Sequence, residues 1–227
     1  LPLTPDAVLA WQPYVVAFAA TGVFFTAALA LLQTNLRRLL AFAVVSHTSL
    51  IVIGLFTLRP LGVQGALLLT VNFGFAVTVL LLMVAFVYRR TQTAELSELG
   101  GLFERIPFIA IAFLIGGFSI VGMPGTPGFD AAHLVLEAAI EHFGALPTVA
   151  AALGNVAAAG FLLWAFQRAF LAPLPEGAKP VERVRPMEYL LGGLTLFVLL
   201  AAGFMPEPWL RLTAAATQAI AARFSGG

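Results

Sequence analysis

Residues 122–144, GMPGTPGFDAAHLVLEAAIEHFG, decide how this chain folds. Two prolines and two glycines in PGTPG, at 124–128, end one apolar helix and begin another. The second helix carries an ionisable stripe, formed by Asp130, His133, Glu137 and Glu141. Spacings of three, four and four residues place these side chains on one helical face. The segment therefore predicts a broken helix followed by a row of ionisable groups.

The composition around this segment is that of an integral membrane protein. Of the 227 residues, 60% are hydrophobic and 10% are charged, whereas soluble domains carry about 25% charged residues. The net charge is +1 and the basic residues form no dense patch for phosphates, which argues against a nucleic-acid partner. Because there is no cysteine and only three scattered histidines, we expect no disulfide, metal or redox cofactor.

Five apolar runs are long enough to cross a bilayer as plain helices. They cover 13–34, 36–58, 61–88, 146–171 and 188–205. A continuous helix over 106–143 would be about 57 Å long, nearly twice the hydrocarbon thickness, so we expect one crossing built from a broken helix. Two marginal spans are the alternative. The predicted fold is an all-α, polytopic membrane bundle of about six crossings, in a single domain over 1–227.

Basic residues are distributed unevenly between the two sets of loops. One set holds Arg37, Arg38, Arg89, Arg90, Arg105, Arg168, Lys179, Arg183 and Arg185, and the other holds Arg59, Arg211 and Arg223. The positive-inside rule then places both ends of this segment on the non-cytoplasmic side of a bacterial inner membrane.

The two ends of the chain carry weaker indications. Within 206–227, an amphipathic tail repeats apolar residues at helical spacing, which suggests a helix lying on the membrane interface. These residues are Trp209, Leu212, Ala216, Ile220 and Phe224. The opening LPLTPDAVLAW lacks the charged start and cleavage site of a signal peptide, and is typical of a loop inside a longer protein.

Ionisable groups at membrane depth cost about 2.5–3.5 kcal/mol each on insertion scales, and usually face a bundle interior or a wet cavity. Carboxyl and imidazole groups about one turn apart can pass a proton, which makes Asp130, His133 and Glu137 candidates for a proton path. The alternatives are a solvated stripe near the membrane surface, especially at Glu141 and the neighbouring His142, and a capping role for Asp130 in the first turn.

A second candidate lies in the middle of the second span. His47, in VVSHTSL, is either a member of a proton path or a buried neutral histidine bonded to a neighbouring hydroxyl. Amides at Gln64, Asn72 and Asn155 are typical of interhelical hydrogen bonds. Small residues at Ala150, Gly154 and Ala158 form a ridge for close helix packing.

Several stretches together resemble one family. LLQTNLRRLLAFAVVSHTSLIVIGLF at 31–56 is similar to the QTD[LI]K[KR]L[IL]AYxSVSHMG pattern of subunit M (ND4-like) antiporter-like proteins of respiratory complex I. The likeness continues in order through VQGALLL, YRRTQTAELSELGGL, GMPGTPGF and WAFQRAF, and so covers essentially the whole chain. It implies a 14-helix fold with two inverted five-helix repeats, each with a broken helix, of which this chain holds the C-terminal six helices.

The resemblance carries over unevenly to single residues. His47 matches the family's SVSH histidine, which belongs to a proposed hydrophilic axis. A second family histidine falls at Phe73, beside Asn72, and the family's terminal glutamate falls at Ala132. Asp130 and His133 flank this lost glutamate, and we interpret them as its possible substitutes. The family's membrane lysines belong to helices upstream of residue 1, and Lys179 lies in a loop.

The resemblance implies a proton-translocating subunit without its own redox centre, in a complex I-like NADH:quinone oxidoreductase. Its partners would be other membrane subunits and the lipid bilayer, and its proton path would include His47, Asn72, Asp130, His133 and Glu137. One alternative keeps the fold in an inorganic-carbon uptake complex, a membrane hydrogenase or a cation/proton antiporter. Another is a structural spacer that has lost transport, because Phe73 and Ala132 replace family residues.

Overall fold

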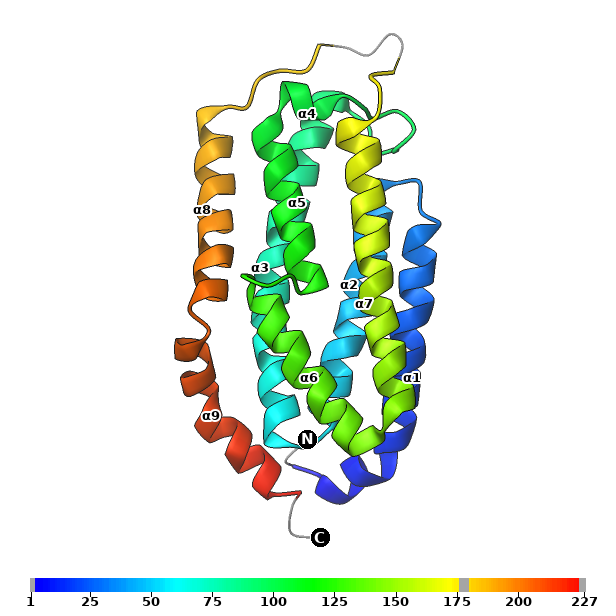
Figure 1. Cartoon of the computed structure of the whole chain (residues 1–227), viewed down its shortest axis with the longest axis vertical. Helices are drawn as coiled ribbons and strands as arrows, with labels where there is room; N and C mark the ends of the chain where they lie inside the picture. The colour runs from blue at the N-terminus through cyan, green and yellow to red at the C-terminus, as the bar shows by residue number, and fades with distance from the viewer. Residues whose placement is uncertain (1–2, 176–179, 225–227) are drawn as a thin grey trace.

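The computed structural model describes residues 3–175 and 180–224, and these residues form helices and connecting turns without a strand. Most of the helices run along the long axis of the molecule (Figure 1). They are α1 (Pro5–Leu31), α2 (Leu36–Phe56), α3 (Pro60–Thr91), α4 (Leu102–Arg105), α5 (Pro107–Val121), α6 (Pro127–Phe143), α7 (Ala145–Phe166), the π-helical turn η1 (Gln167–Leu171), α8 (Pro186–Phe204) and α9 (Glu207–Ala222).

Five of these helices are long and apolar enough to cross a membrane, which confirms the predicted plain spans. They are α1, α2, α3, α7 continued by η1, and α8. The largest difference from prediction is in α1, which begins at Pro5 and continues through Pro13. A proline at the first position lacks only an N–H that needs no partner, and transmembrane helices also tolerate an internal proline.

The predicted broken helix is present as α5 and α6, which follow one another down the bundle (Figure 1). They have 15 and 17 residues, or about 22 and 26 Å, so each is short of a full crossing by itself. Gly122 ends α5 in the left-handed region at φ 79°, and Pro127 begins α6. The break therefore lies at PGTPG, because glycine closes one helix and proline opens the next.

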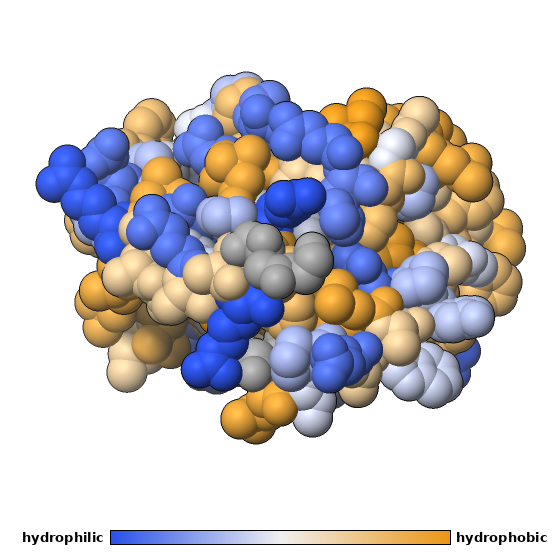
Figure 2. All heavy atoms as spheres, turned by 90° about the horizontal axis from the view of Figure 1, so that it is seen from below, coloured by the Kyte–Doolittle hydropathy of each residue, from blue (hydrophilic) through white to orange (hydrophobic). Residues whose placement is uncertain are grey.

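The two ends of the bundle differ in charge. The basic end, uppermost in Figure 1, holds Arg37 and Arg38 at the start of α2, Arg89 and Arg90 at the end of α3, and the segment before α8. The terminal end holds the start of α1, the end of α9 and the α2–α3 turn with Arg59. Figure 2 shows this terminal end, with hydrophilic side chains over its middle and apolar ones along much of its rim. Lys179 lies outside the described residues.

Two apolar clusters fill the bundle, one toward each end. On α2 the change from one cluster to the other falls between Ala43 and Leu50, on either side of His47. On α3 it falls around Asn72, and on α7 around Asn155. The break between α5 and α6 divides the same two clusters. A polar layer thus crosses the apolar core at the level of the break.

The amphipathic tail forms α9, which packs along α3. The Gln64 side chain donates a hydrogen bond to the Leu210 carbonyl oxygen at 3.0 Å, and Thr217 is buried against the bundle. Leu212, from the predicted apolar stripe, is 78% exposed. The helix therefore has a second contact face, offset from that stripe, which ties it to α3.

Candidate functional site

The C-terminal turn of α5 gathers side chains from three other helices. Backbone carbonyls in the last turn of a helix lack helical partners and need donors from elsewhere. Asn72 on α3 donates to the Ser119 oxygen at 3.2 Å, and Asn155 on α7 donates to the Val121 oxygen at 2.8 Å. Between them, the Ile120 oxygen lies 3.0 Å from Nε2 of His47 on α2. Three successive carbonyls at the break therefore each meet a polar side chain.

His47 is surrounded by hydrogen-bond acceptors. The residue is 3% exposed, and its Nδ1 lies 3.1 Å from the Ala43 carbonyl oxygen. Its Nε2 faces both the Ile120 oxygen and, at 3.2 Å, the Asn155 Oδ1. The amide of Asn155 is oriented by its own donation to Val121, so that oxygen is the atom turned to the ring.

This arrangement has a direct consequence for protons. A neutral imidazole carries one N–H and can donate from only one nitrogen, whereas an imidazolium donates from both. Since both ring nitrogens of His47 face oxygen acceptors, the second proton completes the hydrogen bonding of the site. Among the described residues none of its bonds is to a hydroxyl, because Ser46 bonds the Val23 carbonyl and Thr48 bonds its own helix. The histidine is buried, as that alternative expected, but the hydroxyl partner was predicted wrongly.

The side-chain amides of Asn72 and Asn155 form the interhelical hydrogen bonds that the sequence predicted. Asn155 also contacts the His47 ring. Asn72 also accepts a hydrogen bond from the Ser119 hydroxyl at 2.7 Å, which closes a two-bond link between α3 and α5. Asn155 joins α7 to α5 and also reaches His47. Ser119 was not among the residues predicted for the site, since a single serine in an apolar helix carries no pattern of its own.

Two glycines let the half-helices meet backbone to backbone. A Cβ atom on Gly128, in the first turn of α6, would lie 2.2 Å from the Ser119 carbonyl oxygen and 2.8 Å from Nδ2 of Asn72. Gly122 has a positive φ, which favours glycine, and its Cβ would lie 3.1 Å from the Gly128 oxygen. The contact at the break therefore depends on the absence of these side chains.

The ionisable stripe lies elsewhere. The opposite face of α6 packs against α2 and α3, where a Cβ on Gly54 or Gly65 would come within 3 Å of Val135. The side chains of His133 and Glu137 are consequently 72% and 47% exposed, with Nε2 and Oε2 3.8 Å apart. Asp130 is half-buried. Burial of this stripe within the bundle, as the sequence analysis expected, is not found among the described residues.

The five candidate residues thus form two groups. His47 and Asn72 meet at the break, whereas Asp130, His133 and Glu137 follow the outer face of α6, and no hydrogen bond connects the two groups in the described parts of the chain. Small side chains explain the difference, because glycine and alanine allow the apolar face of α6 to approach α2 and α3 more closely than the polar face can.

The last residues of the ionisable stripe on α6 fit the alternative of a solvated stripe near the membrane surface. Glu141 and His142 are exposed at the terminal end. There, an open cavity of about 560 Å³ is lined by Gln12, Arg59 and His142, among others. Nε2 of Gln12 lies 3.0 Å from Nε2 of His142. Residues 3–175 and 180–224 contain no group of three His, Asp or Glu side chains that could hold a metal ion.

Two positions where the resemblance implies ionisable residues also lie beside the break. Phe73 stacks on the His47 ring, with centroids 5.6 Å apart and planes inclined by 10°. Ala132 is buried, and its Cβ is 3.7 Å from the position that a Cβ on Gly122 would take. The site therefore has apolar side chains at both positions and depends on His47 for its titratable group.

Comparison with known proteins agrees with this architecture. The transmembrane family described as NADH:quinone oxidoreductase/Mrp antiporter matches residues 1–161. NADH-quinone oxidoreductase subunit M of Pseudomonas aeruginosa is 30% identical over 224 residues, which cover 97% of this chain and 43% of that protein. The corresponding Mycobacterium tuberculosis protein (strain H37Rv) is 29% identical over 213 residues, 92% of this chain and 38% of that protein.

A solved structure gives the same result. A chain of respiratory complex I from Thermus thermophilus with bound NADH superposes with a TM-score of 0.90 at 29% identity, over 98% of this chain and 47% of that chain. This chain spans less than half the length of each of these relatives. Because the family match covers well over half of its residues, the chain belongs to the NADH:quinone oxidoreductase/Mrp antiporter family of multi-pass transmembrane proteins.

Proposed function

We propose that this chain is the C-terminal part of a proton-translocating, antiporter-like subunit in a complex I-like NADH:quinone oxidoreductase. Redox chemistry in other subunits would drive proton movement through it, with those membrane subunits as its partners. The observation that carries the proposal is the environment of His47, whose two ring nitrogens both face oxygen acceptors at the break. A group that gains hydrogen bonds on protonation suits a relay that is loaded and emptied in turn.

The path on either side of His47 is also a proposal. Asn72 and Asn155 hold the Ser119 and Val121 carbonyls on either side of the Ile120 oxygen that faces the ring, so they would set where the proton rests. From the break, Asp130, His133 and Glu137 lead along the outer face of α6 toward the terminal end. A water-filled passage or another protein segment along this face would complete the path, since ionisable groups in membranes face such surroundings.

The orientation follows from the charged ends. Eight of the nine basic residues in the larger set are described, and they belong to segments at the basic end. This supports a bacterial inner membrane with the basic end in the cytoplasm and both ends of this segment outside. A cysteine at the exposed position 146 or at position 182, with cysteines elsewhere in the subunit replaced, should react with an impermeant thiol reagent from outside or inside, respectively. The reverse accessibility would refute the orientation.

The function is tested in the whole assembled complex, reconstituted in vesicles. His47→Gln keeps a polar side chain but cannot carry the imidazolium proton, and we expect proton pumping per electron to fall by about tenfold or more. Asp130→Asn tests the outer stripe in the same assay. His142→Gln is the matched control, since this histidine is exposed at the terminal end, and it should pump like the parent.

Two other functions would be supported by different results of these experiments. If assembled His47→Gln and Asp130→Asn complexes both pump like the parent, the chain is a structural spacer, as the apolar Phe73 and Ala132 would allow. The family description also includes Mrp antiporters, so the same fold could serve a cation/proton antiporter, a membrane hydrogenase or an inorganic-carbon uptake complex. Genes adjacent to the one encoding this chain separate these cases, because each assembly has distinctive other subunits.

A further inference from the structure

α8 touches the rest of the bundle at few points. Eight of its 19 residues are exposed, including Met187, Leu190, Leu194 and Phe197. Its buried residues lie along one stripe, at Glu188, Gly192, Leu199, Ala202 and Gly203. The first and last of these are 15 residues apart, or about 22 Å along the helix. The contacts at these two points, together with Phe108 and Met83 against Gly192 between them, set where α8 lies along its own axis.

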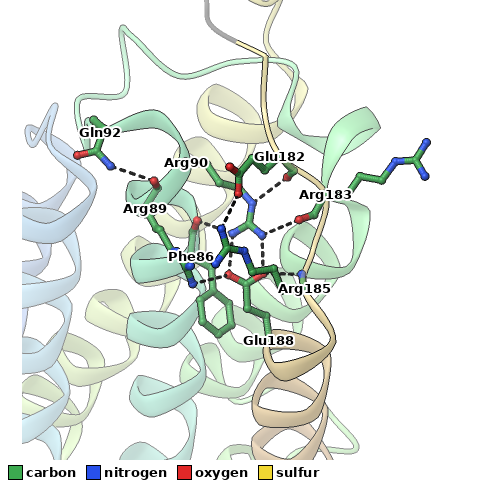
Figure 3. A network of polar contacts seen from close by, with 8 residues as sticks. All are labelled: Phe86, Arg89, Arg90, Gln92, Glu182, Arg183, Arg185 and Glu188. Carbon is green, nitrogen blue, oxygen red and sulfur yellow. Dashed lines mark hydrogen bonds and ion pairs between the residues drawn. The ribbon is translucent and has the colours of Figure 1, made fainter.

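The upper point is a buried ion pair between Arg90 at the end of α3 and Glu188 in the first turn of α8 (Figure 3). Their side chains are 2% and 4% exposed. The Arg90 side chain donates to three backbone carbonyl oxygens, from Nε to Glu182 at 2.9 Å, from Nη1 to Phe86 at 2.9 Å and from Nη2 to Arg183 at 3.0 Å. It also donates to the Glu188 carboxylate, from Nη1 to Oε1 at 3.0 Å and from Nη2 to Oε2. All five guanidinium donors therefore have an acceptor.

Both carboxylate oxygens of Glu188 also have hydrogen-bond donors. Its Oε2 also accepts the backbone N–H of Arg185 at 2.8 Å, which caps the start of α8, and Arg89 Nη1 lies 3.7 Å from its Oε1. Figure 3 shows Arg90 enclosed between α3, the segment before α8 and the first turn of α8. From the sequence, Arg90, Arg183 and Arg185 counted only as basic residues of the same set of loops, and no spacing pattern links positions 90 and 188.

The lower point is the helix break itself. A Cβ on Gly203 would lie 2.7 Å from the Gly125 carbonyl oxygen, 2.8 Å from Cα of Thr126 and 2.9 Å from Cδ of Pro127. The Phe204 ring lies 3.6 Å from the position of a Cβ on Gly125. The end of α8 thus packs directly on PGTPG, and only a glycine fits there. A shift of α8 by one residue would bring the side chain of Ala202 or Phe204 against this backbone.

We propose that Arg90 and Glu188 are positioning residues for the break, acting through α8. Their ion pair sets the axial position of α8, and Gly203 transmits that position to the segment between α5 and α6. This in turn fixes the Ser119, Ile120 and Val121 carbonyls that meet the polar layer. The link to transport rests on the proposed function of His47, whereas the link between ion pair and break rests on the contacts alone.

The test measures the break and the transport separately in the assembled complex. Spin labels on cysteines introduced at Met123 in the break and Val156 on α7, both exposed, report their separation once cysteines elsewhere in the complex have been replaced. Glu188→Gln removes the charge, and Gly203→Ala blocks the contact from the other end. Both should shift or broaden the label distance, and both should lower pumping per electron by about tenfold or more, since a misplacement of about 1 Å can cost about a hundredfold.

Matched controls lie on the same helix and at its start. Gly193→Ala has nothing within 4 Å of its new Cβ, and Arg185→Gln removes only an exposed pair with Glu182. Neither should change the label distance. If Glu188→Gln does not assemble, Arg90→Lys keeps the charge but loses the fork of donors, and should give an intermediate shift.

The outcomes separate the two proposals. A label distance unchanged in assembled Glu188→Gln, Arg90→Lys or Gly203→Ala complexes overturns the positioning role, because a purely stabilising ion pair would lower stability without moving the break. A shifted distance in complexes where His47→Gln still pumps like the parent supports the positioning role and rejects the proton function of the site.

Discussion

Replacing Gly128 by alanine should damage the break more than any other single added methyl group at this site. The new Cβ would lie 2.2 Å from the Ser119 carbonyl oxygen and 2.8 Å from Nδ2 of Asn72. Both neighbours are buried, and the oxygen belongs to the backbone of α5, so neither can turn away as a flexible side chain would. The start of α6 has to move, and the hydrogen bond from Asn72 to Ser119 has to lengthen or break.

The magnitude follows from three contributions. Overpacking a tight contact costs about 1–3 kcal/mol. A lost side-chain hydrogen bond between transmembrane helices costs about 0.6 kcal/mol on average and up to about 1.7 kcal/mol. Alanine offsets this by at most about 1 kcal/mol through its higher helix propensity, and by less in a first turn. We therefore expect Gly128→Ala to lower the free energy of unfolding by about 1–5 kcal/mol, with about 2 kcal/mol as the central value.

The assay is reversible unfolding of the complete subunit in mixed micelles, by titration with SDS and detection by circular dichroism. Gly193→Ala is the matched control, since its Cβ would meet nothing within 4 Å, and it should be neutral or more stable by up to about 1 kcal/mol. In the assembled complex, Gly128→Ala should also lower proton pumping, because the acceptors that face His47 move with the end of α5.

A Gly128→Ala subunit that unfolds at the same SDS fraction as the parent, or at a higher one, would refute the reasoning. It would mean that α5 and α6 do not meet backbone to backbone at this point. Equal changes in Gly128→Ala and Gly193→Ala would refute it as well, because the close contact would then contribute nothing beyond helix propensity.

Three further predictions concern single contacts. Asn155→Leu leaves the partly buried Val121 carbonyl without its side-chain donor, and should cost about 1–3 kcal/mol in the same unfolding assay. Gly154→Ala places a Cβ 2.1 Å from Cγ1 of Val23 and should cost about 1–3 kcal/mol by forcing α1 and α7 apart. Arg185→Gln breaks an exposed ion pair and should change the free energy of unfolding by less than about 1 kcal/mol.

Each of these has a control in the same chain. Thr195→Val removes a hydroxyl that bonds only its own helix, so it should cost less than Asn155→Leu. Gly74→Ala adds a methyl group with nothing within 4 Å and should not destabilise, in contrast to Gly154→Ala. A loss larger than about 1 kcal/mol in Arg185→Gln would show that this surface pair is part of the buried network.

The sequence by itself determined the class of fold and its divisions. Apolar length predicted five plain spans, and PGTPG predicted the broken one, because proline and glycine act on the backbone wherever they occur. It also identified His47 as a mid-span histidine, the amides as interhelical partners and Gly154 as a point of close packing. These features depend on residue type and spacing along one helix, which a sequence contains in full.

The tertiary structure alone decided which groups meet. The acceptors around His47 are mostly backbone carbonyls, which every residue has and no residue type reveals. Helical spacing placed Asp130, His133 and Glu137 on one face but did not determine which way that face turns. Glycines on α2 and α3 decided it, by letting the alanine-rich face of α6 approach. The pairing of Arg90 with Glu188 likewise depends on where α3 and α8 end in space, because contacts between distant segments follow from packing and not from local pattern.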